Sequence, residues 1–215
     1  MTTLIIIAKA PVPGLVKTRL TPPFTPGEAA RLAEAALQDT LAALRRTPAT
    51  DRLLILDGSP DASWLPADVF TVIPQIRGGL DRRLAAAFHE AAATSPDPAF
   101  LVGMDTPQIT PELLSTCLSS LNTTRAVLGP AADGGFWSIG FAKPRELDFS
   151  QIFHEVPMSH PDTGRHQLER LRAAGLTVTL LPELRDFDTA QDAYRVAAEA
   201  PTTNFASLLN LVPSK

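Results

Sequence analysis

LIIIAKAPVPGLVKTRL, residues 4–20, is the stretch of sequence from which the rest of the chain is best interpreted. Its first five residues are apolar and mostly β-branched, which predicts a short strand buried on both faces. A loop follows at once, in which Pro11 fixes the backbone and removes a donor, whereas Gly14 permits a turn or a close approach. The pattern indicates a central parallel strand that opens into a stiff loop.

The loop is cationic, since it carries Lys9, Lys17 and Arg19 but no acidic residue. Parallel sheets bind ligands beyond the carboxyl ends of their strands, where basic groups and free backbone N–H groups suit phosphate. We therefore expect a nucleotide-binding surface formed by Ala8, Lys9, Pro11, Gly14, Lys17 and Arg19. The alternative is that these cations are simply solvated on the surface.

Length and composition favour one α/β domain over residues 1–215. The formal net charge is −4 and no apolar run is long enough to cross a membrane, so neither a nucleic-acid surface nor a membrane face is expected. Cys117 is the one cysteine, which excludes an intramolecular disulfide and fits a reducing, cytoplasmic location. The oligomeric state is left open by the sequence.

Strand and helix patterns alternate along the chain. Thr25, Pro26 and Glu28 form a capping box with proline at the first helical position, which predicts a helix that continues to about Arg46. Further strands are expected at 52–57, 69–74, 100–103, 126–129, 136–141 and 176–181, with helices at about 80–93, from 111, 164–174 and 189–199. This order predicts a three-layer α/β/α sandwich with a mostly parallel, mixed sheet.

Acidic residues follow two of the predicted strands. Asp105 comes directly after the strand at 100–103, and Pro107 disfavours helix just beyond it. Asp186 and Asp188 follow the last strand, although Asp188 is also placed to cap the next helix. Mg²⁺ is commonly held by one or two carboxylates together with phosphate oxygens. Asp105 with Asp186 or Asp188 is therefore a candidate site for Mg²⁺ or Mn²⁺, and Lys17 and Arg19 are candidates to stabilise phosphate charge.

Two other nucleotide-binding classes fit less well. A P-loop needs glycine immediately before its lysine and another five residues earlier, and those positions hold Val16 and Pro11. A P-loop-like kinase is thus the less favoured alternative. No strand is followed by the Gly-x-Gly-x-x-Gly pattern of dinucleotide-binding dehydrogenases.

The combined motifs resemble a bacterial family of glycosyltransferase-A-like proteins, the selenodomain-associated transferases (DUF2064), over nearly the whole chain. That family is related to the nucleotidyltransferases that build molybdenum cofactor dinucleotides and to phospholactate guanylyltransferase. The segments that carry the resemblance are AKAPVPG at 8–14, VKTRL at 16–20, GMDTP at 103–107, GPAADGG at 129–135 and DFDT at 186–189.

The resemblance implies a Rossmann-like glycosyltransferase-A fold that handles a nucleotide with a divalent metal. By matching motif, Lys17 and Arg19 contact phosphates, while Asp105 is the principal metal ligand and Asp188 the second. Asp133, Gly134 and Gly135 line the acceptor side. The family run Gly-Asp-Leu-Gly-Glu-Arg is only partly kept at 78–83, where Arg83 remains a candidate nucleotide ligand.

The function expected from these observations is transfer from an activated nucleotide, a nucleoside triphosphate or a nucleotide sugar, to a small-molecule acceptor. Lys17, Arg19 and Asp105 are the expected catalytic residues. A domain of the same fold that binds a nucleotide or a partner without chemistry is the alternative, because fold alone does not decide function.

Overall fold

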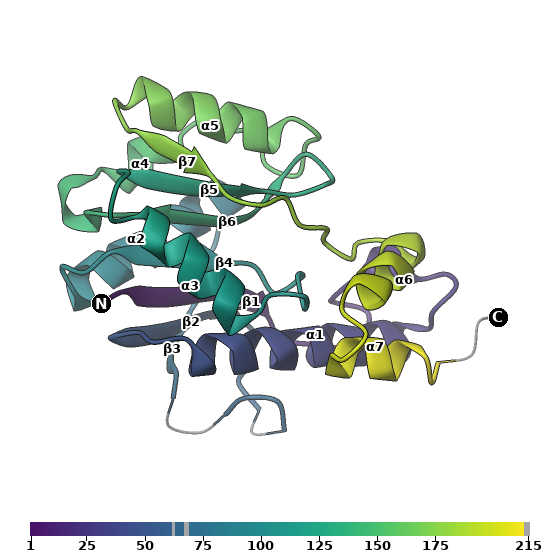
Figure 1. Ribbon diagram of the computed structural model, residues 1–215. Coiled ribbons are helices and arrows are strands. Elements are labelled where there is room, and N and C mark those ends of the chain that lie inside the picture. Colours follow the sequence, from purple (N-terminus) through teal and green to yellow (C-terminus); the bar gives the residue numbers. More distant parts are fainter. Residues whose placement is uncertain (62, 67–68, 213–215) are drawn as a thin grey trace.

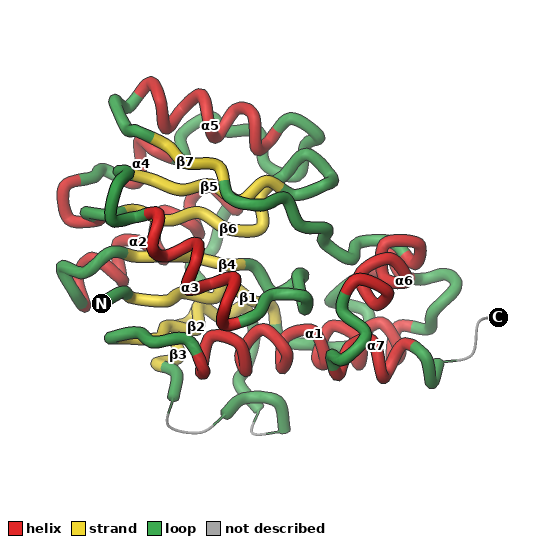
Figure 2. Tube along the Cα trace, in the orientation of Figure 1, coloured by secondary structure: helices red, strands yellow, loops and turns green. Residues whose placement is uncertain are grey.

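The computed structural model describes residues 1–61, 63–66 and 69–212, which fold around one seven-stranded sheet (Figures 1 and 2). Across the sheet the strands run in the order β3-β2-β1-β4-β6-β5-β7. Neighbouring strands are parallel except that β6 is antiparallel to both β4 and β5. The strands are β1 (Thr3–Lys9), β2 (Asp51–Asp57), β3 (Thr71–Pro74), β4 (Ala99–Val102), β5 (Ala126–Pro130), β6 (Phe136–Phe141) and β7 (Val178–Leu180). The predicted α/β class and mixed sheet are confirmed.

Alternate residues of the central strands enter cores on opposite faces of the sheet. Leu4 and Ile6 of β1 pack with helices α1 (Pro26–Arg46) and α3 (Pro111–Ser120), whereas Ile5 packs on the other face. That second face is covered by α2 (Leu80–Thr94), α4 (Phe149–Ile152) and α5 (Thr163–Ala173). Because β1 and β2 are covered on both sides, their apolar residues are continuous instead of alternating with polar ones.

The chain changes direction across the sheet between β1 and β4. β2 and β3 lie on one side of β1, while β4 and the strands that follow it lie on the other. Open α/β sheets form their ligand crevices at such a switch point, beyond the carboxyl ends of the strands. Lys9 at the end of β1 and the segment after β4 are therefore close together by topology.

A third core lies beyond the carboxyl end of the sheet, where α6 (Ala190–Glu199) and α7 (Asn204–Leu209) pack beside the start of α1 (Figure 1). Leu20 of the short 3-10 helix η1 (Thr18–Leu20) and Phe187 are both completely buried in it. This core joins the loop after β1 to the segment after β7, and so holds together two parts of the chain that are remote in sequence.

Most helix limits agree with the sequence, while two strands and several short helices differ. The Thr25–Glu28 capping box is present at the start of α1, and Gly175 follows α5 with φ +75°. β3 and β7 are shorter than predicted, because 69–70, 176–177 and 181 lie outside the strands. The 3-10 helices η1 and η2 (Pro144–Glu146) and the short helices α4 and α7 were not predicted, since such brief elements have little periodicity.

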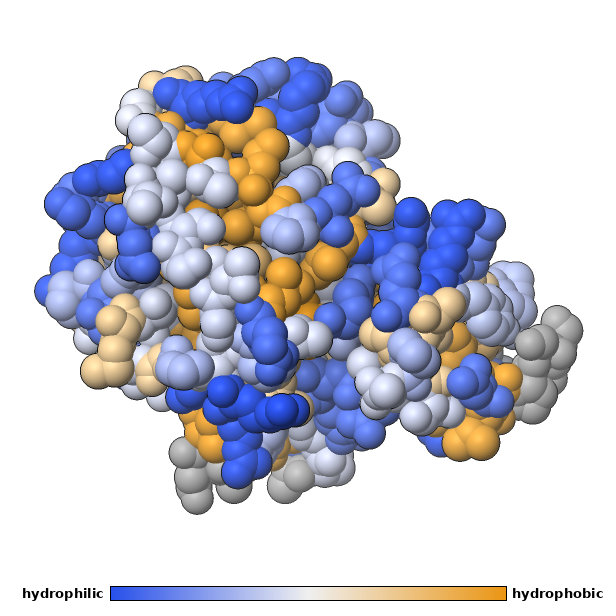
Figure 3. All heavy atoms as spheres, viewed as in Figure 1, coloured by the Kyte–Doolittle hydropathy of each residue, from blue (hydrophilic) through white to orange (hydrophobic). Residues whose placement is uncertain are grey.

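The outer surface is mixed in character. Hydrophilic residues predominate over α5 and α6, whereas apolar surface is visible between α3 and α5 (Figure 3). Strand β7 lies at the edge of the sheet and carries the half-exposed Leu180. Among the described helices, none combines the length and apolar character needed to span a bilayer.

Candidate active site

A cavity of about 490 Å³ opens at the switch point between β1 and β4. Its floor is formed by the carboxyl ends of these strands, including Lys9 and Gly103. Four acidic residues line it: Asp105, Asp133, Asp186 and Asp188. Arg19 and Arg83 also contribute to the wall. The cavity thus brings together charged residues from segments throughout the chain.

Lys17 lies at the centre of the charged cluster. Its Nζ is 2.9 Å from Oδ1 of Asp105 and 2.8 Å from Oδ1 of Asp188, and only 6% of its side chain is exposed. The ammonium also lies 4.2 Å from the centre of the Phe187 ring, a cation–π contact. Arg19 NH2 is 3.0 Å from the other oxygen of Asp188. The predicted cations and carboxylates therefore form one ion-pair network.

The backbone of the loop aims Lys17 inward. Lys17 has φ +48° and ψ +43°, a left-handed conformation that is unusual for a residue with a side chain, and it immediately precedes η1. Leu20 at the end of η1 is buried in the third core. The loop is thus anchored by Leu20 while its unusual turn directs Lys17 toward the segments after β4 and β7.

Electrostatics favour the charged forms in this network. Burial lowers the pKa of Lys17, but the carboxylates of Asp105 and Asp188 more than offset that effect, so its pKa is raised. Burial alone would raise the pKa of Asp188, but Lys17 and Arg19 hold that pKa below the usual value. Lys17 and Asp188 are consequently both ionised near neutral pH.

Asp186 behaves differently from its neighbours. Burial, reinforced by the negative charge of Asp105, raises its pKa to about 8. Its Oδ1 is buried and, among the described residues, has no hydrogen-bond partner. Asp186 is therefore mostly protonated at neutral pH in this state, and the residue lines the cavity.

Gln75 and Arg83 form a second polar group in the wall. The Gln75 side-chain amide donates to the carbonyls of Ala8 (2.7 Å) and Ile55 (3.1 Å), which lie near the carboxyl ends of β1 and β2. Arg83 NH1 donates to Gln75 Oε1 at 3.0 Å. Gln75 thereby fixes the end of β1 and orients Arg83 on α2.

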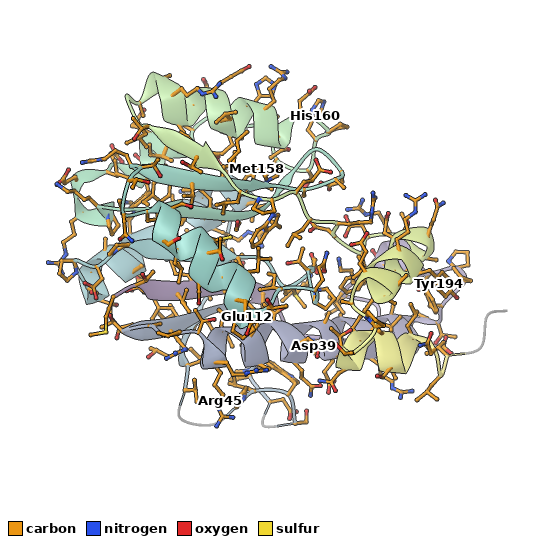
Figure 4. All side chains as sticks on the ribbon, in the orientation of Figure 1. Asp39, Arg45, Glu112, Met158, His160 and Tyr194 are labelled. Carbon is orange, nitrogen blue, oxygen red and sulfur yellow. The ribbon has the colours of Figure 1, made fainter. Side chains whose placement is uncertain are left out.

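The turn between β5 and β6 borders the other side of the cavity. Asp133 Oδ1 accepts a hydrogen bond from the Gly135 N–H at 2.8 Å, and Gly134 has φ +90°. The Gly134 carbonyl accepts from the Gly164 N–H at 2.8 Å, which joins the turn to the start of α5. The loop before α5 carries Met158 and His160, both of which line the cavity and are labelled in Figure 4.

Most predicted site residues reach the cavity, but not all. Ala8, Lys9, Arg19, Arg83, Asp105, Asp133, Gly135 and Asp188 line it, and Lys17 lies against Asp105 and Asp188. Pro11, Gly14 and Gly134 are outside the lining set. Gly14 has φ +77° and serves the turn, while Gly134 supports the loop before α5. For these three residues, direct ligand contact stays a prediction without geometric support.

Sequence reasoning does not identify Gln75 or Phe187 as parts of the site. Gln75 follows β3 directly, and Asp105 lies three residues beyond the end of β4, so a polar residue just past a strand is the available signal. Phe187 gives no such signal, since its role depends on the approach of Lys17 from a distant part of the chain. The sequence offers Asp186 as the alternative to Asp188, and both line the cavity.

The residues present are compatible with Mg²⁺ or Mn²⁺. The available donors are carboxylate oxygens, which these ions prefer, and the buried Oδ1 of Asp186 lacks a partner within the described chain. No cluster of three or more His, Cys, Asp or Glu side chains arranged to hold a metal occurs among the residues described. A site of this kind suits Mg²⁺ whose coordination is completed by phosphate oxygens and water. It does not suit a metal that is held by protein ligands alone.

Comparison with known families gives a match over residues 40–160, more than half of the chain, to the family of uncharacterized proteins conserved in bacteria (DUF2064). The chain belongs to the DUF2064 family. The matched region contains Asp105 and the β5–β6 turn, whereas Lys17 and Asp188 lie on either side of it. No match was found among the curated proteins.

Solved structures place this DUF2064 protein among nucleotide-diphospho-sugar transferase-like folds. A protein of Desulfovibrio desulfuricans G20, provisionally described as a nucleotide-diphospho-sugar transferase, is 29% identical with a TM-score of 0.86, covering 98% of this chain and 94% of its own. CMP:2-keto-3-deoxy-manno-octonic acid synthetase complexed with CTP is 14% identical, with a TM-score of 0.57 and coverages of 92% and 97%. Rv0371C of Mycobacterium tuberculosis H37Rv complexed with manganese is 21% identical, with a TM-score of 0.51 and coverages of 91% and 97%.

Proposed function

We propose that this protein is a divalent-metal-dependent transferase that binds an activated nucleotide in the cavity and transfers part of it to a small acceptor. The observation that carries the proposal is the convergence of Asp105, Asp188, Lys17 and Arg19 at the switch point of the sheet. Two carboxylates for a metal and two cations for phosphates are the groups that such a reaction needs.

In this proposal Asp105 and Asp188 hold Mg²⁺ or Mn²⁺, which supplies positive charge next to the phosphate group that departs. Lys17 and Arg19 stabilise the charge that builds on the leaving phosphates. Gln75 and Arg83 border the nucleotide side of the cavity, where Arg83 contributes further N–H donors. Asp133 and the loop carrying Met158 and His160 border the acceptor side.

Two forms of the reaction fit this arrangement. In nucleotidyl transfer an acceptor oxygen attacks the α-phosphorus of a triphosphate and releases pyrophosphate. In sugar transfer the acceptor attacks the anomeric carbon of a nucleotide sugar and releases a nucleoside diphosphate. The synthetase with bound CTP supports the first form, and the description of the Desulfovibrio protein supports the second. The released product distinguishes them.

Thermal unfolding with a panel of nucleoside triphosphates and nucleotide sugars tests the proposal. A ligand that binds the native state at a hundred times its Kd stabilises by about 2.7 kcal/mol, which raises the Tm by roughly 5–10 °C for a chain of this size. We expect such a rise for one ligand class with Mg²⁺ or Mn²⁺, and its loss with EDTA.

Two variants test whether the ligand-induced rise in Tm depends on the carboxylates of the cavity. Asp105→Asn is expected to lose the metal-dependent rise, because it removes one carboxylate charge. Asp51→Asn makes the same change at the start of β2, the opposite end of the strand from the cavity, and should keep it. A nucleotide that binds equally well with EDTA would favour the binding domain without chemistry. No rise with any ligand would contradict both.

A further inference from the structure

Lys17 is positioned where it competes with a metal ion for the same oxygens. Its Nζ bridges Oδ1 of Asp105 at 2.9 Å and Oδ1 of Asp188 at 2.8 Å. Mg²⁺ binds carboxylate oxygens at about 2.0–2.1 Å, so an ion bridging these two oxygens needs the space that the ammonium fills. The Lys17 side chain and a bridging cation therefore exclude one another.

Each oxygen of Asp188 also has a cationic partner. Oδ1 accepts from Lys17, and Oδ2 pairs with Arg19 NH2 at 3.0 Å. The two carboxylates are thus matched by two cations, which leaves no net negative charge from these four groups to attract a free divalent ion. Displacement of Lys17 by such an ion would strand a buried ammonium without a counter-charge, which is strongly unfavourable.

A polyphosphate changes this balance because it offers the displaced ammonium new anionic partners. Lysine suits such an exchange, since its charge is carried on a flexible stem of four carbons. The phosphate oxygens also complete the coordination of a metal for which the protein provides few ligands. The polyphosphate gives the displaced ammonium a counter-charge, and the metal frees that ammonium to pair with the polyphosphate. Each ligand therefore favours binding of the other.

We propose that Lys17 determines ligand selection at this site, so that the carboxylate pair rejects a free divalent cation and accepts one that arrives with a polyphosphate. The inference rests on the proposed function, because it takes Asp105 and Asp188 as the metal-binding pair. Coupling of this kind is reciprocal, so the polyphosphate raises metal affinity by the same factor as the metal raises polyphosphate affinity.

Equilibrium dialysis of Mn²⁺ against the full chain tests the proposal. Wild-type protein is expected to bind Mn²⁺ alone weakly, and the Mn²⁺ complex of inorganic tripolyphosphate at least about tenfold more tightly, within the usual range of coupling. Lys17→Met is expected to bind Mn²⁺ alone at least about tenfold more tightly than wild type and to gain less from tripolyphosphate, because only the coordination of the metal by phosphate oxygens remains. Lys143→Met removes the same charge from an exposed lysine paired with Glu146, and should match wild type.

Lys17→Gln serves as a second neutral variant if Lys17→Met does not fold, because its amide can still donate to one carboxylate. If wild type binds free Mn²⁺ as tightly as the neutral Lys17 variants do, Lys17 is no barrier and the inference is overturned, while the proposed metal site stands. If none of the proteins binds Mn²⁺ with or without tripolyphosphate, the proposed function fails and the inference fails with it.

Discussion

At the scale of single residues, Asp186 shows how neighbours with the same side chain acquire different properties. Asp188 pairs with Lys17 and Arg19, and its pKa falls below the usual value. Asp186 is two positions away, yet burial and the charge of Asp105 raise its pKa to about 8. The contrast arises because Asp186 is buried and has no ion pair within the described residues, whereas Lys17 pairs with Asp105 and Asp188.

This difference predicts a pH dependence of stability. With a pKa of about 8 in the folded state and an ordinary value of 3.8 in the unfolded chain, Asp186 keeps its proton on folding while the unfolded chain loses it. The folded state therefore binds more protons than the unfolded chain. The contribution of Asp186 to stability is full below about pH 4 and is lost as the pH rises toward about 8. The unfolding free energy, measured with urea, should fall between about pH 5 and 8 in the wild type. In Asp186→Asn we expect this fall to be smaller by on the order of 2 kcal/mol.

Asp51→Asn is the control, since Asp51 lies at the other end of the sheet. If Asp186→Asn and wild type show the same decline over that pH range, Asp186 is ionised in the folded protein and the description of its environment is wrong.

At the scale of elements, the sequence predicts what depends on short-range chemistry. The start of α1 follows from Thr25, Pro26 and Glu28, because a capping box is complete within four residues. The conformation of the loop before α5 does not follow in this way. Thr163 Oγ1 donates toward the carbonyls of Pro157 and His160, and the loop packs against the β5–β6 turn.

Gly134 connects these two elements and gives a prediction at this scale. It has φ +90°, and a Cβ there would collide with the carbonyl oxygen of Pro161. We expect Gly134→Ala to cost on the order of 2–4 kcal/mol in unfolding free energy, from backbone strain and the forced shift of the loop. Binding on the acceptor side should weaken as well.

Gly27→Ala provides the matched comparison, measured by urea unfolding of both variants. Gly27 lies in the first turn of α1 with nothing near the added methyl group, so its replacement should be neutral or slightly stabilising. Equal stability of Gly134→Ala and wild type would show that the loop is not held against the turn.

At the scale of the whole molecule, the site depends on a packing arrangement that local sequence does not encode. The α/β class, the mixed sheet and the strand-end acids could be predicted from alternation and spacing. The ion pair between Lys17 and Asp188 could not, because the two residues are 171 positions apart and meet only when α6 and α7 pack beside α1. The family resemblance assigned both motifs to one nucleotide and metal site, and the fold brings them together.

Asp39 anchors that arrangement from the middle of α1. Its carboxylate accepts hydrogen bonds from the backbone N–H groups of Asn204 and Phe205 and from the Asn204 side chain, at 2.9–3.0 Å. Asp39→Ala would leave the first turn of α7 without these partners and should lower the unfolding free energy by about 1–3 kcal/mol. Asp39→Asn keeps an acceptor and should lose less. Equal losses from the two variants would mean that the acceptor role is unimportant.

A crystal structure with Mn²⁺ and the nucleotide identified by thermal unfolding tests whether Asp105 and Asp188 hold the metal, through the anomalous signal of manganese. We expect one manganese peak between the carboxylates of Asp105 and Asp188, with Lys17 and Arg19 directed to the phosphates. A nucleotide bound in the cavity with no metal at these carboxylates, and with Lys17 still bridging them, would contradict this expectation.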